Sequence, residues 1–532
     1  MARNGFTPKD IDQIEAHGLA PEQVTAQLAH FRHPPPLFRP DRPCTIGDGI
    51  RSIPEPEQHR LIERYDHHPP ARGCLKFVPA SGAASRMFRD LLGFFNSGEE
   101  IDLAGAESMA KAGRKDARAL LDFMGSIDKF AFFDDLASHL SAGGKDLGKA
   151  LEGGRFHEVL HCLLDPHEMD CAALPKGLIK FHAYPDGNRT PFEEHLVEAA
   201  SYASSGQGRC RLNCTVSNAH RRKFEDLLAR ERGRYERMLG VSFDVEFSVQ
   251  PPATDTIAVD PDNRPFRTPD GRLLFRPGGH GALLAVLNSR DEDMIFIKNI
   301  DNVAPDRLKP ETVKWKKVLA GYMLRLQDRI FSFMKGLHSE NVNETLPTEA
   351  VTFLWKELAM PVPSSFETLP NDEKRAFLLD ALDRPLRVCG MVESMGEPGG
   401  GPFWLKGARG DRAPQIVEKG QIDPHADDGE TILKSATHFN PVDLVCGIRD
   451  WRGGRFDLNR FTDPDAVLIS VKSKGGRDIK ALEHPGLWNG GMARWNTALV
   501  EVPAITFNPV KVVNDLLRKE HQPAQGAASI VK

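Results

Sequence analysis

Residues 76–89 read KFVPASGAASRMFR, and this stretch predicts how the rest of the chain is organised. Residues 76–80 have the apolar character of a short buried strand. Residues 81–85 are all small and predict a tight turn, and residues 86–95 predict the amphipathic start of a helix. The stretch is therefore expected to form a strand, a small-residue loop and a helix in succession.

A loop of this composition is suited to binding phosphate. Small side chains let a polyphosphate approach the backbone, where N–H groups and a helix N-terminus favour negative charge. We interpret Ser81, Gly82, Ala83 and Ser85 as this cradle, with Arg86 as its fixed positive charge. The same residue types also fit an ordinary strand-to-helix turn, so the motif needs support from elsewhere in the chain.

Composition narrows the class of protein. The 532 residues are 40% hydrophobic and 27% charged, with a formal net charge of −5, as expected of a soluble protein without a nucleic-acid partner. The eight cysteines include no Cys-x-x-Cys pair, which favours reduced thiols and disfavours structural zinc. No apolar run is long enough to span a bilayer, and the N-terminus lacks the apolar core of a secretion signal. We expect a cytoplasmic protein with no membrane partner.

Strand and helix patterns alternate through the middle of the chain. Residues 209–217 and 241–249 predict strands, residues 219–239 a helix, and residues 293–300 a strongly apolar strand. Residues 176–184, KGLIKFHAY, also have strand character. This order predicts an α/β fold with a mainly parallel, Rossmann-like sheet, whose ligands lie at the carboxyl ends of the strands.

The predicted organisation is a core interrupted by helices. Residues 1–70 form an N-terminal helical extension, and residues 71–305 the first part of the core, with a helical insertion at about 102–170. Residues 306–386 are a second helical insertion. Residues 387–532 complete the core with an acceptor site and a C-terminal segment.

Charged residues at strand ends are candidates for chemistry. Asp301 follows the apolar strand, where a carboxylate can ligate a metal beside the ligand crevice, although a turn cap is an equal explanation. Arg189 lies in a loop after a predicted strand, and with Lys180, His182 and His195 it could line an anionic site. Surface charges on a loop and a helix explain these residues equally well, except Arg189, whose place in a strand-end loop favours a functional role.

Five stretches in order resemble the UDP-sugar pyrophosphorylases, nucleotidyltransferases with a glycosyltransferase-A-like α/β core. These are PASGAASRM from residue 79, FSVQPPA from 247, PGGHG from 277, KNIDN from 298, and WNT from 495 with FNPVK from 507. The ordered combination is more specific than any single match. The chain is still more similar to an uncharacterised bacterial family that carries the Pro-Ala-Ser-Gly-Ala-Ala-Ser-Arg-Met signature.

This resemblance implies transfer of a nucleotide, most simply from UTP, to a sugar-1-phosphate, with Mg²⁺ as cofactor and these small molecules as partners. It implies that the cradle and Arg86 hold phosphates, that Asp301 holds the metal, and that Lys511 stabilises charge on the transferred group, with Arg189 as a further catalytic candidate. The remaining residues are assigned to the nucleotide (Gln250, Gly278 and Gly279) and to the acceptor sugar (Asn496, Thr497 and Glu397).

The chain also departs from the pyrophosphorylase pattern. The usual Gly-Gly-x-Gly-Thr-Arg is replaced by residues 81–86, and no Pro-Lys follows shortly afterwards, so Arg89 is the candidate to replace that lysine. His280 stands where the related loop has asparagine. Two alternatives stay open: a non-catalytic nucleotide or sugar-phosphate sensor, and a transferase that uses a ready-made nucleotide-sugar through Asp260-Pro261-Asp262.

Overall fold

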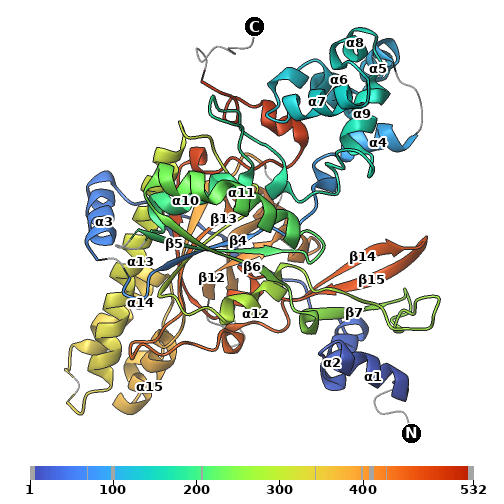
Figure 1. Cartoon of the computed structure of the whole chain (residues 1–532). Helices are drawn as coiled ribbons and strands as arrows, with labels where there is room; N and C mark the ends of the chain where they lie inside the picture. The colour runs from blue at the N-terminus through green and yellow to red at the C-terminus, as the bar shows by residue number, and fades with distance from the viewer. Residues whose placement is uncertain are drawn as a thin grey trace. The chain divides into compact units, whose positions relative to one another are not determined.

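The computed structural model describes residues 6–68, 70–97, 102–204, 208–341, 343–396, 399–406, 412–426 and 428–524 (Figure 1). Its largest feature is a nine-stranded sheet in the order β2-β3-β16-β10-β13-β9-β4-β5-β6. The strands are β2 (Thr45–Ile46), β3 (Gly49–Arg51), β4 (Cys74–Pro79), β5 (Arg209–Val216), β6 (Ser242–Val249), β9 (Met294–Lys298), β10 (Leu386–Glu393), β13 (His438–Gly447) and β16 (Asn496–Glu501). The predicted α/β class is confirmed.

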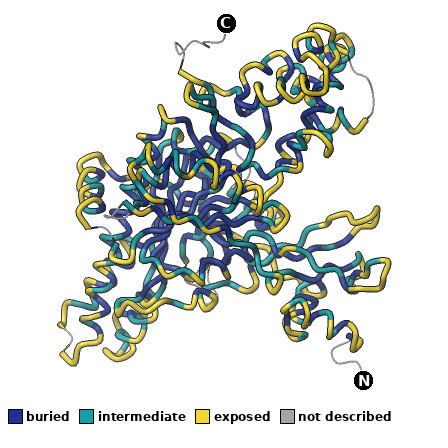
Figure 2. Tube along the Cα trace, in the orientation of Figure 1, coloured by how far each residue is buried: buried dark blue, intermediate teal, exposed yellow. Residues whose placement is uncertain are grey.

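The large sheet is mixed but mostly parallel. Strand β10 runs parallel to β16, β16 parallel to β3, and β3 parallel to β2. Strand β13 pairs with β10 in the antiparallel direction, with an irregularity between Gly390 and Val392. Strands β9 and β13 are buried along their whole length, as expected for strands inside a covered sheet (Figure 2).

The chain divides into two compact units, which are described separately. Unit 1 comprises Met1–Leu75, Ser248–Ile297 and Lys316–Ala504, and unit 2 comprises Lys76–Phe247, Lys298–Trp315 and Ile505–Lys532.

Unit 2 contains a helical group with a continuous apolar core. Helices α4 (Arg89–Ser97), α5 (Leu103–Lys111), α6 (Lys115–Met124), α7 (Phe133–Ala142), α8 (Leu147–Glu152) and α9 (Phe156–Leu164) bury leucine, phenylalanine and alanine side chains against one another (Figure 1). Ala84, Val303 and Val510 belong to the same cluster. The predicted helical insertion therefore shares its core with the small-residue loop and the C-terminal segment.

Two further helices of unit 2 support the strands. Helix α10 (Pro191–Tyr202) starts at a capping box, in which the Thr190 hydroxyl accepts from the Glu193 N–H and the Glu193 carboxylate accepts from the Thr190 N–H. Nearly every side chain of α10 is buried. Helix α11 (Arg221–Leu239) is amphipathic and ends at Gly240, whose φ of 66° is the left-handed conformation that glycine adopts easily.

Unit 1 holds smaller sheets. Helices α1 (Pro8–Ala16) and α2 (Pro21–Arg32) share a core with a four-stranded sheet of order β14-β15-β7-β8. Its strands are β14 (Leu468–Lys474), β15 (Arg477–Glu483), β7 (Asp255–Val259) and β8 (Phe275–Pro277), and a three-stranded sheet joins β1 (Arg42–Pro43), β11 (Gly400–Lys406) and β12 (Arg412–Glu418). Helices α3 (Glu55–His67), α12 (Leu283–Asn288), α14 (Leu346–Leu358), α15 (Asn371–Leu382) and α16 (Gly429–Lys434) belong to this unit, and α13 (Lys309–Leu337) begins in unit 2.

Two local predictions were wrong. Residues 176–184 form no strand: they contain a short 3₁₀ turn, Lys176–Leu178, and an isolated bridge between His182 and Arg189. The helix after the small-residue loop begins at Arg89, because a 3₁₀ turn at Ala84–Arg86 comes first.

All eight cysteines are buried and none forms a disulfide. Burial raises the pKa of the Cys171 and Cys214 thiols to about 12. These thiols are therefore held in their unreactive, protonated form. Among the described helices, none has the length and apolarity needed to cross a membrane.

Candidate functional site

The small-residue loop leaves the end of β4 and presents its backbone outwards. The N–H of Ala80 donates to Thr215 O at 2.9 Å, which fixes the strand end. Ser81, Gly82 and Ala83 are exposed, and a Cβ on Gly82 would meet no atom within 4 Å. Within the described residues, the N–H groups of these three residues have no acceptor in the protein. They are available to an anionic ligand.

A second segment lies against this loop, although it comes from beyond the helical insertion. Ala84 N–H donates to Leu174 O at 2.8 Å, and Ala83 forms a bridge with Pro175. Lys176 follows, and its Nζ donates to Asp301 Oδ2 at 2.7 Å. A Pro-Lys pair, Pro175-Lys176, therefore lies against the loop in space, although none follows the loop shortly in the sequence. Sequence reasoning missed it because helices α4 to α9 separate it from Arg86.

Asp301 follows β9 and is contacted by a third segment, residues 508–511. Val510 N–H donates to Asp301 O at 3.1 Å, and Asn508 N–H donates to Asn302 Oδ1 at 2.9 Å. These bonds bring Lys511 beside Asp301, with Nζ 3.4 Å from Oδ2. Lys176, Asp301 and Lys511 thus meet from three separate parts of the sequence. Pairing of Lys511 with Asp301 was not predicted.

Neighbouring charges and burial shift the pKa values of Asp301 and Lys176. Burial alone would raise the pKa of Asp301, but Lys511 and Lys176 outweigh it and hold that pKa below its usual range. Burial lowers the pKa of Lys176, and the positive charges of Lys511 and Arg86 act in the same direction, against the attraction of Asp301. Three cations therefore act around one carboxylate, which favours the binding of anions here.

Asp301 also fits the chemistry of a magnesium ligand. Both lysines bind Oδ2, and Oδ1 has no partner within the described chain. No group of three or more His, Cys, Asp or Glu side chains in the described residues could hold a metal. Mg²⁺ is commonly held by one or two carboxylates together with substrate phosphates and water, so a single free carboxylate oxygen near the small-residue loop is a suitable donor set.

A fully buried network lies behind Asp301. The Glu198 carboxylate accepts from Lys76 Nζ and Lys298 Nζ, each at 2.8 Å. His195 Nε2 lies 3.3 Å from Ile300 O, the carbonyl that precedes Asp301. Burial holds the pKa of His195 well below its usual value, so the ring is neutral and its Nε2–H donates to that carbonyl. These contacts fix the backbone that carries Asp301.

Arg189 occupies a different buried cluster. Its Nη1 donates to Asp306 Oδ1 at 2.8 Å and lies 3.6 Å from Glu194 Oε2, and its guanidinium stacks over Tyr184 at 3.9 Å. Lys180 pairs with Asp135 at 2.8 Å. Both predicted cations are therefore engaged by protein groups, and a catalytic role for Arg189 stays a prediction. Arg89 pairs with its neighbour Asp90 and is largely exposed.

The residues predicted to bind the base lie in unit 1. A Cβ on Gly278 would lie 2.4 Å from His484 Cδ2, and Gly279 has a φ of 74° and lies against Glu483. Packing thus requires both glycines, whatever else they contact. Gln250 Nε2 donates to Asp255 Oδ1 at 3.3 Å.

The predicted acceptor residues also lie in unit 1. Asn496 is fully buried and donates to Leu382 O at 3.3 Å. The Thr497 hydroxyl accepts from Arg387 Nε at 2.8 Å. Glu397 lies outside the described residues.

Solved structures similar to this chain include a variant of UDP-glucose pyrophosphorylase from Leishmania major. It is 12% identical, with a TM-score of 0.44, over 96% of this chain and 77% of the other. A uridine diphosphate N-acetylglucosamine pyrophosphorylase from Trypanosoma brucei is 13% identical, with a TM-score of 0.46, over 96% of this chain and 82% of the other. A UDP-glucose phosphorylase from Trypanosoma brucei is 11% identical, with a TM-score of 0.43, over 96% of this chain and 80% of the other.

Among curated proteins, none matches the chain. One family model, described as "Domain of unknown function (DUF4301)", matches residues 7–522, which is nearly the full length. The chain therefore belongs to the DUF4301 family.

Proposed function

We propose that this protein is a sugar-1-phosphate nucleotidyltransferase, which joins a nucleoside triphosphate, with UTP as the first candidate, to a sugar-1-phosphate and releases pyrophosphate. The observation that carries the proposal is the meeting of Lys176, Asp301 and Lys511 beside an exposed loop with free backbone N–H groups. The motif resemblance supports the assignment of the same loop, aspartate and lysine to this reaction.

The reaction needs positioning and charge neutralisation more than covalent chemistry from the protein. An oxygen of the sugar-1-phosphate attacks the α-phosphorus in line, the bond to the bridging oxygen breaks, and pyrophosphate leaves. The N–H groups of residues 81–83 and the Arg86 guanidinium would hold the β- and γ-phosphates. Mg²⁺, when bound by Asp301 and phosphate oxygens, would supply neutralising charge at the phosphates.

Lys176 and Lys511 would have different roles in the reaction. Lys176 is 13% exposed and is held by both Asp301 and Val510 O, so it would fix the metal-binding carboxylate and present charge from one direction. Lys511 is 52% exposed and has a single, longer contact, so it is free to turn to the transferred phosphate. In unit 1, we assign the base to Gln250, Gly278 and Gly279 and the acceptor sugar to Asn496, Thr497 and Glu397.

The direct test is a screen of the purified protein for pyrophosphate release. Each nucleoside triphosphate is paired with a set of sugar-1-phosphates, with Mg²⁺ or with excess EDTA. We expect release with one or a few pairs, loss of release with EDTA, and a preference for uridine or thymidine triphosphate over purines.

Asp301→Asn provides the matched control, because it keeps the shape of the side chain and removes its charge. We expect the variant to lose Mg²⁺-dependent turnover and to retain a cooperative thermal transition. Calorimetric binding of a nucleotide without pyrophosphate release from any pair would instead support the sensor alternative and overturn the enzymatic proposal.

A further inference from the structure

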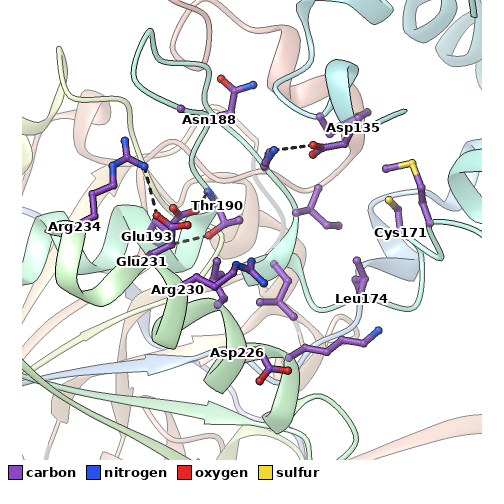
Figure 3. Close-up of a pocket in the computed structure, with 18 residues that line it drawn as sticks. Asp135, Cys171, Leu174, Asn188, Thr190, Glu193, Asp226, Arg230, Glu231 and Arg234 are labelled. Atoms are coloured by element: carbon purple, nitrogen blue, oxygen red, sulfur yellow. Dashed lines mark hydrogen bonds and ion pairs between the residues drawn. The ribbon is translucent and has the colours of Figure 1, made fainter. Parts of the chain in front are cut away.

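Unit 2 contains a pocket of about 630 Å³ that the proposed reaction does not use (Figure 3). The volume suits a metabolite-sized ligand. It is open to solvent and lies between α11, the segment at residues 169–190, the start of α10 and residues 132–135 at the start of α7. Its apolar walls are formed by Phe132, Met169, Leu174, Leu178, Ile179 and Leu227.

Most polar groups that line this pocket already have partners in the protein. Lys180 pairs with Asp135, and Arg234 with Asp186 and Glu231. Asp226 pairs with Arg222, and the Glu193 carboxylate accepts from Thr190 N–H and Tyr235 O–H. The acidic side chains of the lining are therefore all engaged in ion pairs or hydrogen bonds within the protein.

Lys223 and Arg230 are the exceptions. Both line the pocket from α11, and neither has an acidic partner within 4 Å among the described residues. They are seven residues apart, which is close to two helical turns, so they lie on the same face of α11 about 10 Å apart along its axis. Arg230 reaches from α11 into the pocket opposite Leu174 (Figure 3). The lining has as many acidic as basic side chains, and within it Lys223 and Arg230 are the exposed cations without an ion-pair partner among the described residues, next to an apolar wall.

This combination favours a dianion attached to an apolar body. A phosphomonoester carries nearly two negative charges at neutral pH, and a guanidinium binds it through paired N–H donors. The apolar walls would cover a ring or chain of the same molecule. A carboxylate would satisfy only half of the available charge.

The pocket wall is continuous with the segment that carries Lys176. Leu174 and Leu178 line the pocket, and Lys176 lies between them with its Nζ on Asp301. A Cβ on Gly177 would lie 3.0 Å from the Phe224 ring on α11 and 3.1 Å from the Ile300 side chain. Helix α11 and the residue before Asp301 thus both pack closely against Gly177.

We propose that this pocket is a regulatory site for a small phosphomonoester with an apolar body, held by Lys223 and Arg230 and coupled to Lys176 through residues 174–179. The binding of this ligand depends only on the pocket, whereas its regulatory effect depends on the proposed function. A molecule in the pocket would press on the Leu174 and Leu178 side chains and so change the position of Lys176 relative to Asp301.

The probe is phenyl phosphate, titrated into the full-length protein by calorimetry. We expect the Lys223→Gln/Arg230→Gln double variant to bind it about tenfold more weakly or worse, since two charge-assisted contacts are removed. Arg237→Gln is the matched control, because Arg237 is an exposed cation on α11 that does not line the pocket. Inorganic phosphate and phenol, each with half of the recognised chemistry, should bind more weakly than phenyl phosphate.

A Lys511→Met variant separates this pocket from the proposed active site. Retained binding in Lys511→Met with loss in the double variant supports the proposal, as does slower amide exchange of residues 174–179 on binding. Equal binding by wild type and double variant, or loss in Lys511→Met alone, overturns it. These readouts need no turnover, so a failed pyrophosphate screen would leave them unaffected. If turnover is found, phenyl phosphate should change kcat in the wild type and leave the double variant unchanged.

Discussion

Lys176 and Lys511 bind the same carboxylate oxygen but are held very differently. Lys176 is mostly buried and has a second acceptor in Val510 O, whereas Lys511 is half exposed and has one contact at 3.4 Å. Loss of a buried cation leaves its carboxylate partner unpaired, while an exposed ion pair contributes little to stability. The two residues should therefore respond differently to the same substitution.

We predict that Lys511→Met lowers kcat by about 10²-fold or more, with little change in nucleotide affinity. An interaction made mainly in the transition state leaves ground-state binding almost unchanged. Lys176→Met should lower kcat as well, but should also lower the melting temperature, because Asp301 loses its buried partner. Steady-state kinetics, nucleotide calorimetry and thermal unfolding measure the three quantities.

Lys115→Met is the control for these variants, since Lys115 is exposed at the start of α6, away from Asp301 in sequence. It should match the wild type in all three measurements. Unaltered kcat in Lys511→Met would remove this residue from the proposed active site. An unchanged melting temperature in Lys176→Met would show that its bond to Asp301 is not structural.

At the scale of elements, the C-terminal segment has its own anchor. The Asp515 carboxylate is buried and accepts from Lys511 N–H at 2.7 Å and Val512 N–H at 2.8 Å. Val513 N–H donates to Met87 O at 3.0 Å, just after the 3₁₀ turn that contains Arg86. The backbone on both sides of Lys511 is thus fixed, which holds the start of an exposed side chain in a defined place.

Asp515→Ala should lower both stability and turnover. It leaves two N–H groups without their acceptor, at a cost of about 1–3 kcal/mol in the free energy of unfolding, and it releases the backbone of Lys511. Asp515→Asn is the matched comparison, since its carbonyl oxygen can still accept, and it should recover most of the loss. Urea unfolding and kcat measure the effect. If the alanine variant keeps full turnover, the anchor does not position Lys511.

The end of the same segment makes unit 2 sensitive to acid. His521 is buried, its Nδ1 lies 2.9 Å from His182 Nε2, and burial together with neighbouring positive charge lowers the pKa of His521 to about 3. The unfolded chain takes up a proton near pH 6.5, and the folded chain does not. Stability therefore falls as pH decreases from about 6.5 to 3, by up to about 1.4 kcal/mol per pH unit.

Urea unfolding at pH 7 and pH 5 tests this dependence. The wild type should lose about 2 kcal/mol more than His521→Gln over this interval, because the glutamine can keep the contact with His182 but has no proton to gain. Parallel losses in the two proteins would show that His521 stays accessible to protons in the folded state. Buried His195 should add to the acid sensitivity of both proteins equally.

At the scale of the whole molecule, local periodicity predicted helices and strands, but it did not predict contacts between distant parts of the sequence. The patterns at residues 209–217, 219–239 and 241–249 predicted β5, α11 and β6 to within about two residues. The strand character of residues 176–184 has a physical basis, because Gly177, Ile179 and Phe181 are all buried. Ile179 and Phe181, however, pack into the core of the helical insertion and have no strand beside them. Burial with a period of two does not require a sheet.

The site was predicted in part for the same reason. Asp301 and Lys511 each follow a recognisable local motif, and the structure places them together. Lys176 has no local signal that separates it from a surface lysine. Its position depends on the bridge between Ala83 and Pro175, which closes a loop of about 90 residues, and such a pairing has no periodicity to detect.

The burial of every cysteine supplies a built-in reporter of unfolding. Unit 1 holds Cys44, Cys74, Cys389 and Cys446, and unit 2 holds Cys162, Cys171, Cys210 and Cys214. Alkylation with iodoacetamide in increasing urea, followed by peptide mass spectrometry, would therefore record each unit separately in the unmodified protein. We expect native protein to resist alkylation, and saturating nucleotide to shift the urea midpoint of the unit 2 thiols if the phosphate loop binds it. A nucleotide that shifts only the unit 1 midpoint would locate binding away from this loop.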